Sequence, residues 1–351
     1  MNENPESPVI LSVEPSLALP GGEVRLHGRA LLSSLTPNNQ TKATEVSVGD
    51  AVATVVFATP TQLTVLVPDA ASGDSITVTT PQGSDSVDFT LATLLSENLH
   101  PVANPAVDDR GNIYVTFSGS RGQSVPTSLF RIDDESTLHA LDAEVMNPTG
   151  LALDNDRNLY ISSRHDGNVY RLDTAGDLTT YAEGMGVATG LAFDRLGNLY
   201  VGDRSGTIFK IAPDRQIFVF ATLEPSVAAY HLAFSPNGNL YVTGPTTSSN
   251  DCVYEIDQSG VVTPFFGHLG RPQGLAFDRE GNLYVAASWR GRRGILRITP
   301  AREAALVIGG VNLVGLAFDP NRALIVTTTS AAFFLPFDVP GFILTPELPE
   351  F

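Results

Sequence analysis

The stretch "GLAFDREGNLYV", residues 274–285, returns along the chain in slightly altered forms. It reads as two apolar strands joined by a short polar turn, because apolar residues flank a cluster of Asp, Glu, Gly and Asn. The alanine of the first strand recurs about every 40 to 46 residues. Six copies align: PAVDDRGNIYV (105–115), GLALDNDRNLYI (150–161), GLAFDRLGNLYV (190–201), HLAFSPNGNLYV (231–242), GLAFDREGNLYV (274–285) and GLAFDPNRALIV (315–326).

Each copy continues in the same way, with a variable loop, a third strand such as "TIFKIA", a polar turn and a fourth strand such as "QIFVFA". A period of about 40–50 residues with four strands per unit is typical of a β-propeller blade. We therefore expect six blades. The segments "AFFLPFD" (332–338) and "GFILTP" (341–346) supply the third and fourth strands of the last copy, so the ring should close in sequence order. A strand borrowed from residues 93–99 is the alternative.

The turn within each copy follows the pattern D-x-x-G-N. An aspartate such as Asp278 accepts hydrogen bonds from backbone N–H groups two residues on, and Gly281 adopts a positive φ without steric cost. These residues therefore predict a structural role. Arg157 and Arg322 replace the glycine in two copies, and we expect those two blades to close the turn differently.

Residues 8–92 lie outside the repeat and contain short Val-, Thr- and Leu-rich strands separated by turns, a pattern that predicts a small β-sandwich. The segments "VEPSLALPGGEVRLHG", "VSVGD", "LTVLVP" and "SITVTTPQGSDSVDF" resemble the IPT/TIG immunoglobulin-like family. The resemblance implies a spacer or interaction module, and some members of that family bind DNA. The chain up to residue 92 carries ten acidic residues against three basic ones, which argues against DNA binding here.

The sequence thus predicts an all-β protein: an immunoglobulin-like sandwich at residues 8–92, a linker at 93–104, and a six-bladed propeller at 105–346. The formal net charge of -17 disfavours nucleic acid and anionic membrane surfaces as partners. One cysteine, Cys252, excludes an internal disulfide framework. No apolar run is long enough for a membrane span, and the first residues have no signal-peptide pattern. We expect a cytoplasmic protein, with export or the cell surface as the alternative.

The blade repeat "GLAFDxxGNLYV" resembles the NHL family and the regucalcin/gluconolactonase-like six-bladed propellers over residues 101–345. The NHL likeness implies binding of proteins, peptides or RNA. The lactonase likeness implies a divalent metal at the channel mouth, held by carboxylates and amides just before each "GL". The matching residues contain no carboxylate and one amide: Ala103, Thr149, Thr189, Tyr230, Gln273 and Val314. We therefore expect no cofactor and no metal site, with calcium or another divalent cation as the alternative.

Two sets of residues are candidates for ligand binding. The first is the channel mouth, where His231 replaces the glycine of "GLAF" beside four residues of the set above: Thr149, Thr189, Tyr230 and Gln273. The second is the rim formed by the loops between second and third strands and by the connections between blades. Arginines, one histidine and one tryptophan gather there: Arg121, Arg164, His165, Arg204, Arg271, Trp289, Arg290, Arg292 and Arg293.

Arginine suits bidentate recognition of carboxylate or phosphate, and Trp289 offers an aromatic platform. The leading interpretation is a non-enzymatic binding or scaffold protein whose arginine rim recognises an anionic small molecule or an acidic protein segment. A rim whose arginines pair with acids of neighbouring loops is the structural alternative. The functional alternatives are a gluconolactonase-like hydrolase with a metal in the channel, and a cell-surface or secreted module for adhesion or carbohydrate association.

Overall fold

The computed structural model describes residues 6–32, 44–120, 122–248 and 250–342. Every regular element in these ranges is a β-strand. None of the residues described forms a helix long and apolar enough to cross a membrane. The chain divides into two compact units: the first comprises Met1–Thr93, Gly291–Ile295 and Ala305–Val311, and the second comprises Leu94–Arg290, Leu296–Ala304 and Asn312–Phe351.

The first unit contains a sandwich of two antiparallel four-stranded sheets. One sheet has the order β1 (Val9–Glu14), β3 (Glu23–Arg29), β7 (Gln62–Leu66), β6 (Thr54–Thr59). The other has the order β5 (Ala51–Val52), β4 (Glu45–Val48), β8 (Ser75–Thr80), β9 (Gly83–Asp88). Alternate residues of both sheets face inward and form the core with no exposed surface, among them Val24, Leu26, Val46, Leu63, Ile76 and Val78. Two short strands, β2 (Leu17–Ala18) and β10 (Thr90–Leu91), pair in parallel.

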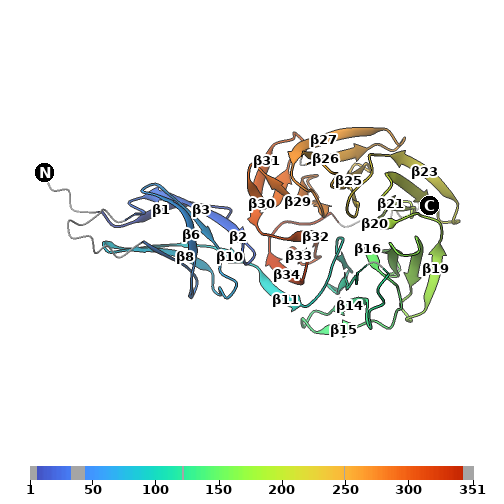
Figure 1. Ribbon diagram of the computed structural model, residues 1–351, viewed down its shortest axis with the longest axis horizontal. Coiled ribbons are helices and arrows are strands. Elements are labelled where there is room, and N and C mark those ends of the chain that lie inside the picture. The colour runs from blue at the N-terminus through green and yellow to red at the C-terminus, as the bar shows by residue number, and fades with distance from the viewer. Residues whose placement is uncertain (1–5, 33–43, 121, 249, 343–351) are drawn as a thin grey trace, which may run out of the picture. The chain divides into compact units, whose positions relative to one another are not determined.

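The propeller is a ring of blades with four strands each, and the colour in Figure 1 passes from teal through green and yellow to red around it. Five blades are four-stranded sheets, whereas the strands of the fifth blade belong to a six-stranded sheet that also contains β2 and β10. The sheets follow one another in the order of the sequence repeat, each with its strands in chain order. Blade 1 is β12 (Ala106–Val107), β13 (Ile113–Thr116), β14 (Leu129–Ile132) and β15 (Leu138–Ala140). Blade 2 is β16 (Pro148–Leu153), β17 (Leu159–Ser163), β18 (Val169–Leu172) and β19 (Leu178–Ala182). Blade 3 is β20 (Ala188–Phe193), β21 (Leu199–Asp203), β22 (Thr207–Ile211) and β23 (Ile217–Thr222).

Blade 4 is β24 (His231–Phe234), β25 (Leu240–Thr243), β26 (Asp251–Ile256) and β27 (Val262–Leu269). Blade 5 is β28 (Leu275–Phe277), β29 (Leu283–Trp289), β30 (Arg292–Ile298) and β31 (Ala304–Gly309). The six-bladed architecture expected from the repeat is therefore confirmed.

The last blade is completed by a strand from the other end of the repeat region. It consists of β32 (Leu313–Phe318), β33 (Ala323–Thr328), β34 (Ala331–Pro336) and, outside β34, β11 (Thr93–Glu97). The prediction that the ring closes in sequence order is wrong, and the segment expected to be a linker supplies a strand. Gly341 and Phe342, expected in the fourth strand, lie instead beside β28, while residues 343–346 are outside the described ranges.

Neighbouring blades are held together by a repeated aromatic contact. The second strand of one blade carries a tyrosine whose ring meets, edge to face, the phenylalanine that ends the first strand of the next blade. The ring centroids are 4.9 Å apart for Tyr160 and Phe193, and 5.0 Å apart for Tyr200 and Phe234. The small residues of the first strand allow this convergence: a Cβ on Gly190 would lie 2.4 Å from the carbonyl oxygen of Tyr230.

The turn between first and second strands is held by its aspartate. In blade 3 the carboxylate of Asp194 accepts the N–H groups of Leu196 and Asn198, both at 2.9 Å, and the Asn198 amide at 2.7 Å. The hydroxyl of Tyr200 donates to the same carboxylate at 3.3 Å. Equivalent networks surround Asp108, Asp154 and Asp278. The interactions of these four carboxylates are thus structural.

Arg157 and Arg322 take the same left-handed conformation as the glycines that they replace. Their φ angles are 63° and 66°, against 79° for Gly197 and 83° for Gly281. Arg157 N–H donates to the Asp154 carbonyl at 3.0 Å, just as Gly197 does to Asp194 at 3.2 Å. The expectation that these blades close the turn differently is wrong, because the hydrogen bonds of the turn outweigh the strain of one positive φ.

In blade 4 the turn asparagine still donates a hydrogen bond to a carboxylate, but that carboxylate comes from the third strand and not from the turn. Ser235 stands where the other blades have the turn aspartate, and Glu255 stands on the third strand where blades 2 and 3 carry Arg171 and Lys210. The Asn239 amide donates to Glu255 Oε1 at 2.7 Å, so the carboxylate reaches the asparagine from the other side.

This swap predicts strong coupling between positions 235 and 255. Glu255→Arg should lower the free energy of unfolding by about 1–3 kcal/mol, because it leaves the buried side of Asn239 without its acceptor. Adding Ser235→Asp should restore most of the loss, since the double variant recreates the arrangement of blades 2 and 3. Urea unfolding of the two single variants and the double variant measures the coupling, and simple additivity would contradict it.

Ring closure by β11 predicts unequal effects of two adjacent leucines. Leu95 packs on the cluster of Ile113, Val115 and Ile325, whereas Leu94 is 50% exposed. Leu95→Ala should lower the free energy of unfolding by about 1–3 kcal/mol, and Leu94→Ala should change it by less than about 0.5 kcal/mol. Chemical denaturation of both variants tests the closure; equal effects would argue against it.

Candidate functional site

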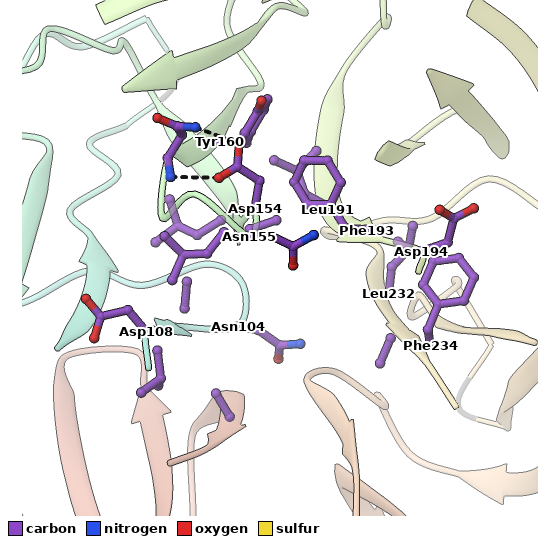
Figure 2. A pocket seen from close by; sticks show the side chains of 18 of the residues that line it. Asn104, Asp108, Asp154, Asn155, Tyr160, Leu191, Phe193, Asp194, Leu232 and Phe234 are labelled. Carbon is purple, nitrogen blue, oxygen red and sulfur yellow. Dashed lines mark hydrogen bonds between the residues drawn. The ribbon is translucent and has the colours of Figure 1, made fainter. Parts of the chain in front are cut away.

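A cavity of about 960 Å³ lies in the central channel of the propeller. It opens at the end of the channel where the first strand of each blade turns into the second, because the turn residues Asp154–Asn158 and Asp194 line it. Figure 2 shows Leu191 and Phe193 of β20, and Leu232 and Phe234 of β24, on one side of this cavity.

The apolar part of the cavity wall comes from the innermost strands. The "Leu-Ala-Phe" segments contribute a leucine level and, nearer the mouth, a phenylalanine level. The lining residues at these levels are Leu151, Leu191, Leu232, Leu275 and Leu316, followed by Phe193, Phe234, Phe277 and Phe318. A concave apolar wall with a few polar groups is the usual form of a ligand site.

The innermost strands also present backbone polar groups to the channel. Each innermost strand ends its sheet and pairs with a neighbour on one side only, so the other edge faces the channel. Asn104 caps two of these edges: its amide donates to the Leu275 carbonyl at 3.1 Å and its oxygen accepts Leu316 N–H at 3.3 Å. The Phe277 carbonyl accepts the N–H of Phe342 at 2.8 Å.

Five aspartates line the cavity, Asp108, Asp109, Asp154, Asp156 and Asp194, and three of them are turned away from its middle or held by their own turn. In Figure 2 the carboxylates of Asp108 and Asp194 are directed away from the middle of the pocket, and that of Asp154 accepts the hydrogen bonds of its own turn. Asn104 and Asn155 reach inward instead. These three carboxylates therefore shape the mouth and leave the asparagines to face a ligand.

Two arginines line the cavity on the side of blades 2 and 3. Arg215 lies over the ring of Tyr181, 5.2 Å from its centroid, and Arg171 lies on the neighbouring strand. Burial raises the pKa of Tyr181, and the charges of Arg215 and Arg171 oppose that rise. A third arginine, Arg157, lies 3.7 Å from the carboxylate of Asp109. Arg171 and Arg215 are therefore the cations placed to meet an anionic group.

The residues present do not fit a divalent metal. Within the described part of the chain, no three His, Cys, Asp or Glu side chains are grouped so as to hold an ion. The turn aspartates already accept three or four hydrogen bonds each. A hard cation requires several oxygen ligands grouped around one point, and the described carboxylates of this mouth are not grouped in that way.

Three arginines of the predicted rim are held by other parts of the protein. Arg164 donates to the Gly119 carbonyl at 2.8 Å, and Arg204 donates to the Val227 carbonyl at 2.9 Å. Arg292, in the first unit, lies 3.2 Å from Glu23 and donates to the Glu14 carbonyl at 2.7 Å. These three side chains hold backbone carbonyls, and of the three Arg292 also pairs with an acid. Arg121 lies outside the described residues.

The remaining rim residues are more open. His165, Arg271, Arg290 and Arg293 are exposed, and Arg290 stacks on Trp289 at 4.2 Å. The expected loop "ASWRGRRG" is instead a tight hairpin: Arg290 and Gly291 have φ angles of 50° and 77°, the pattern of a type I′ turn, between the seven-residue strands β29 and β30. None of the described rim residues lines the cavity described above.

The predicted channel-mouth residues are ties between strands and blades. Thr149, Thr189, Tyr230 and His231 are at most 2% exposed. Thr189 donates to the Gly202 carbonyl at 2.7 Å and accepts Tyr230 N–H at 3.2 Å, while the Gln273 amide donates to the Leu313 carbonyl at 3.3 Å. Thr149 donates to the Asn147 carbonyl at 3.3 Å. None of the five lines the main cavity.

His231 is the unusual member of this set. It is 1% exposed, and neither ring nitrogen has a hydrogen-bond partner among the described residues. Burial lowers its pKa from 6.5 to about 3, so the imidazole is neutral near pH 7. The imidazole stands at the sequence position that glycine occupies in blades 2, 3, 5 and 6.

This burial predicts a pH-dependent loss of stability. Between about pH 6.5 and pH 3 the unfolded chain binds a proton at His231 and the folded chain does not, so the free energy of unfolding should fall as the pH falls through that window. The slope should reach about 1.4 kcal/mol per pH unit. Urea unfolding at pH 7, 6 and 5 should show this component in the wild type and not in His231→Gln. The exposed His165→Gln is the control; parallel profiles for all three proteins would contradict the assignment.

Sequence reasoning missed the residues that do line the cavity. Asn104 aligns with the glycine of "GLAF" in the other copies, and a polar side chain at a position otherwise small was a detectable signal. Arg171 and Arg215 belong to strand and turn patterns that gave no sign of the channel. Phe342 lines the cavity because the segment after β34 runs back to the channel, whereas the repeat predicts that this residue lies in the fourth strand of the last blade.

Comparison with known proteins supports the two-part organisation. Residues 8–93 match the IPT/TIG domain. No curated protein matches the sequence significantly. Among solved structures, a putative gluconolactonase has a TM-score of 0.57 with 19% identity, covering 72% of this chain and 93% of that one. A luciferin-regenerating enzyme has a TM-score of 0.57 with 16% identity, covering 74% of this chain and 100% of that one.

A third structure spans both parts of the chain. An auxiliary nutrient binding protein from Bacteroides ovatus has a TM-score of 0.52 with 13% identity, covering 94% of this chain and 98% of that one. At these identities the likeness shows the fold alone. Residues 8–93 therefore form a region that matches the IPT/TIG domain, and the residues that follow form a six-bladed β-propeller whose fold is similar to that of these solved structures.

Proposed function

We propose that the protein is a non-enzymatic binding protein whose ligand enters the propeller channel at the end formed by the first-to-second-strand turns. The observation that carries this proposal is the cavity of about 960 Å³, which is built from the innermost strands. Its volume falls in the upper part of the range usual for small-molecule sites, and the apolar part of its wall is mainly Leu, Phe and Ala. The ligand therefore has an apolar body.

The ligand also carries an anionic group. Arg171 and Arg215 line one side of the mouth, while the nearby Asp154 and Asp194 are already engaged by the N–H groups of their turns. The anionic partner that the arginine content suggested is thus retained, and its site moves to the opposite end of the channel from the predicted rim. Guanidinium groups bind carboxylates with charge-assisted hydrogen bonds.

A metal-dependent lactone hydrolase has less support. Hydrolysis of that kind needs an ion that polarises the carbonyl or activates a water, and the described residues group no set of acidic or imidazole ligands at the channel. The likeness to a putative gluconolactonase concerns the fold.

The test uses 8-anilinonaphthalene-1-sulfonate, a probe with an apolar body and one anionic group. The wild type should bind it with enhanced fluorescence. Arg171→Gln combined with Arg215→Gln should weaken binding about tenfold, or about 1.4 kcal/mol, through loss of charge-assisted contacts. Asn155→Trp should abolish binding by filling the mouth, because Asn155 is exposed and points into the cavity.

Ala175→Trp is the matched control, since Ala175 is exposed on another turn of the same blade and does not line the cavity. Its affinity for the probe should equal that of the wild type. Equal probe affinity in the wild type and Asn155→Trp would place the dye elsewhere on the surface and overturn the proposed site.

A further inference from the structure

The last described residues of the chain follow a fixed path from blade 6 to the cavity. After β34 ends at Pro336, the Phe337 ring packs on Tyr284 and Phe318, at centroid distances of 5.4 and 6.3 Å. Arg322 then holds Asp338 twice, by an ion pair of 2.8 Å and by a hydrogen bond of 2.8 Å to the carbonyl. The segment is therefore anchored before it reaches the channel.

Residues 340–342 pair with the inner edge of blade 5, at the end of β28 and the start of the turn that follows it. Arg279 N–H donates to the Pro340 carbonyl at 3.0 Å, Gly341 stands opposite Asp278 in an antiparallel bridge, and Phe342 N–H donates to the Phe277 carbonyl at 2.8 Å. This is the geometry of strand addition, in which an extended segment satisfies the unpaired groups of a sheet edge.

Side chains reinforce the backbone pairing. The guanidinium of Arg195, from blade 3, lies 5.5 Å from the centroid of the Phe342 ring, and this ring lines the cavity. A side chain at Gly341 is sterically excluded, because a Cβ there would lie 2.1 Å from Cβ of Phe318. The edge thus accepts a backbone with a small residue followed by an aromatic one.

The geometry points to an extended peptide segment as the ligand class of this channel: a small residue followed by an aromatic one, paired with the inner edge of β28, with Pro340–Phe342 occupying that place in cis. This inference rests on the proposed function, because it names the ligand of the same cavity. An acidic peptide meets both requirements, since its backbone pairs with the strand edge and its carboxylates reach Arg171 and Arg215 on the opposite side.

Occupancy in cis makes the segment a competitor of any peptide in solution. An intramolecular segment acts at an effective concentration of about millimolar, so a free peptide binds weakly while the segment is in place. Releasing the segment should therefore raise the affinity of the site for a peptide of the same sequence.

The experiment uses the full-length chain and a fluorescein-labelled peptide with the sequence of residues 338–344. Gly341→Val in the protein should displace the segment, because its side chain collides with Phe318, and should tighten peptide binding at least tenfold over wild type in fluorescence anisotropy. Phe342→Asp should also tighten it, by removing the ring from Arg195. Phe218→Ala, at an exposed phenylalanine outside the cavity, should bind like the wild type.

Two further results decide the inference. A peptide carrying Phe342→Ala should bind the Gly341→Val protein at least tenfold more weakly than the unchanged peptide does. If Gly341→Val does not unfold cooperatively on heating, the same comparison is made with the Phe342→Asp protein. Equal peptide affinity in the wild type and Phe342→Asp proteins overturns the inference. The sulfonate probe separates this failure from failure of the proposed function. If peptide affinities are equal but Asn155→Trp still loses the probe while Ala175→Trp keeps it, the peptide class is overturned and the channel remains a site for small ligands.

Discussion

Six sheets converge on one axis, and their innermost strands pair on one side only. This geometric constraint explains the most regular features of the chain. Backbones approach so closely that the positions nearest the axis are glycine or alanine, with Asn104 and His231 as the exceptions. The unpaired edges leave N–H and C=O groups facing the channel, and those groups need partners. Asn104 and Phe342 supply such partners on blades 5 and 6.

Much of the fold could be predicted from the sequence because the repeat encodes local physics. Alternating apolar residues give the strands, and the aspartate of each turn gives the hydrogen bonds that close it. Closure of the ring was not predictable in the same way. The fourth strand of the last blade comes from β11, and the sequence of Thr93–Glu97 is an ordinary edge strand that does not specify its partner. The decisive contact is between residues far apart in the chain, which periodicity does not report.

The site was less predictable than the fold. The arginines on the loops predicted a positively charged rim. In the structure, however, Arg204 donates to the Val227 carbonyl and Arg292 pairs with the Glu23 carboxylate. A guanidinium has five donors, so an arginine near exposed backbone carbonyls is readily consumed by them. The residues that line the cavity instead belong to the repeat itself, where a structural pattern conceals them. Blade 4 shows how far such a pattern can vary: Ser235 and Glu255 exchange the positions of polar group and charge and preserve the hydrogen bond to the asparagine.

Closure by β11 also determines when the ring can close during translation. The strand at Thr93–Glu97 is made about 230 residues before its partner at Ala331–Pro336. At translation rates of about 5–20 residues per second, that interval is on the order of tens of seconds. During it, β11 has an apolar edge and no partner, while the first blades can already assemble behind it. The ring is thus sealed only after the last blade has been made, and a ribosome that stalls before that point releases an open propeller with a strand that can pair with another chain.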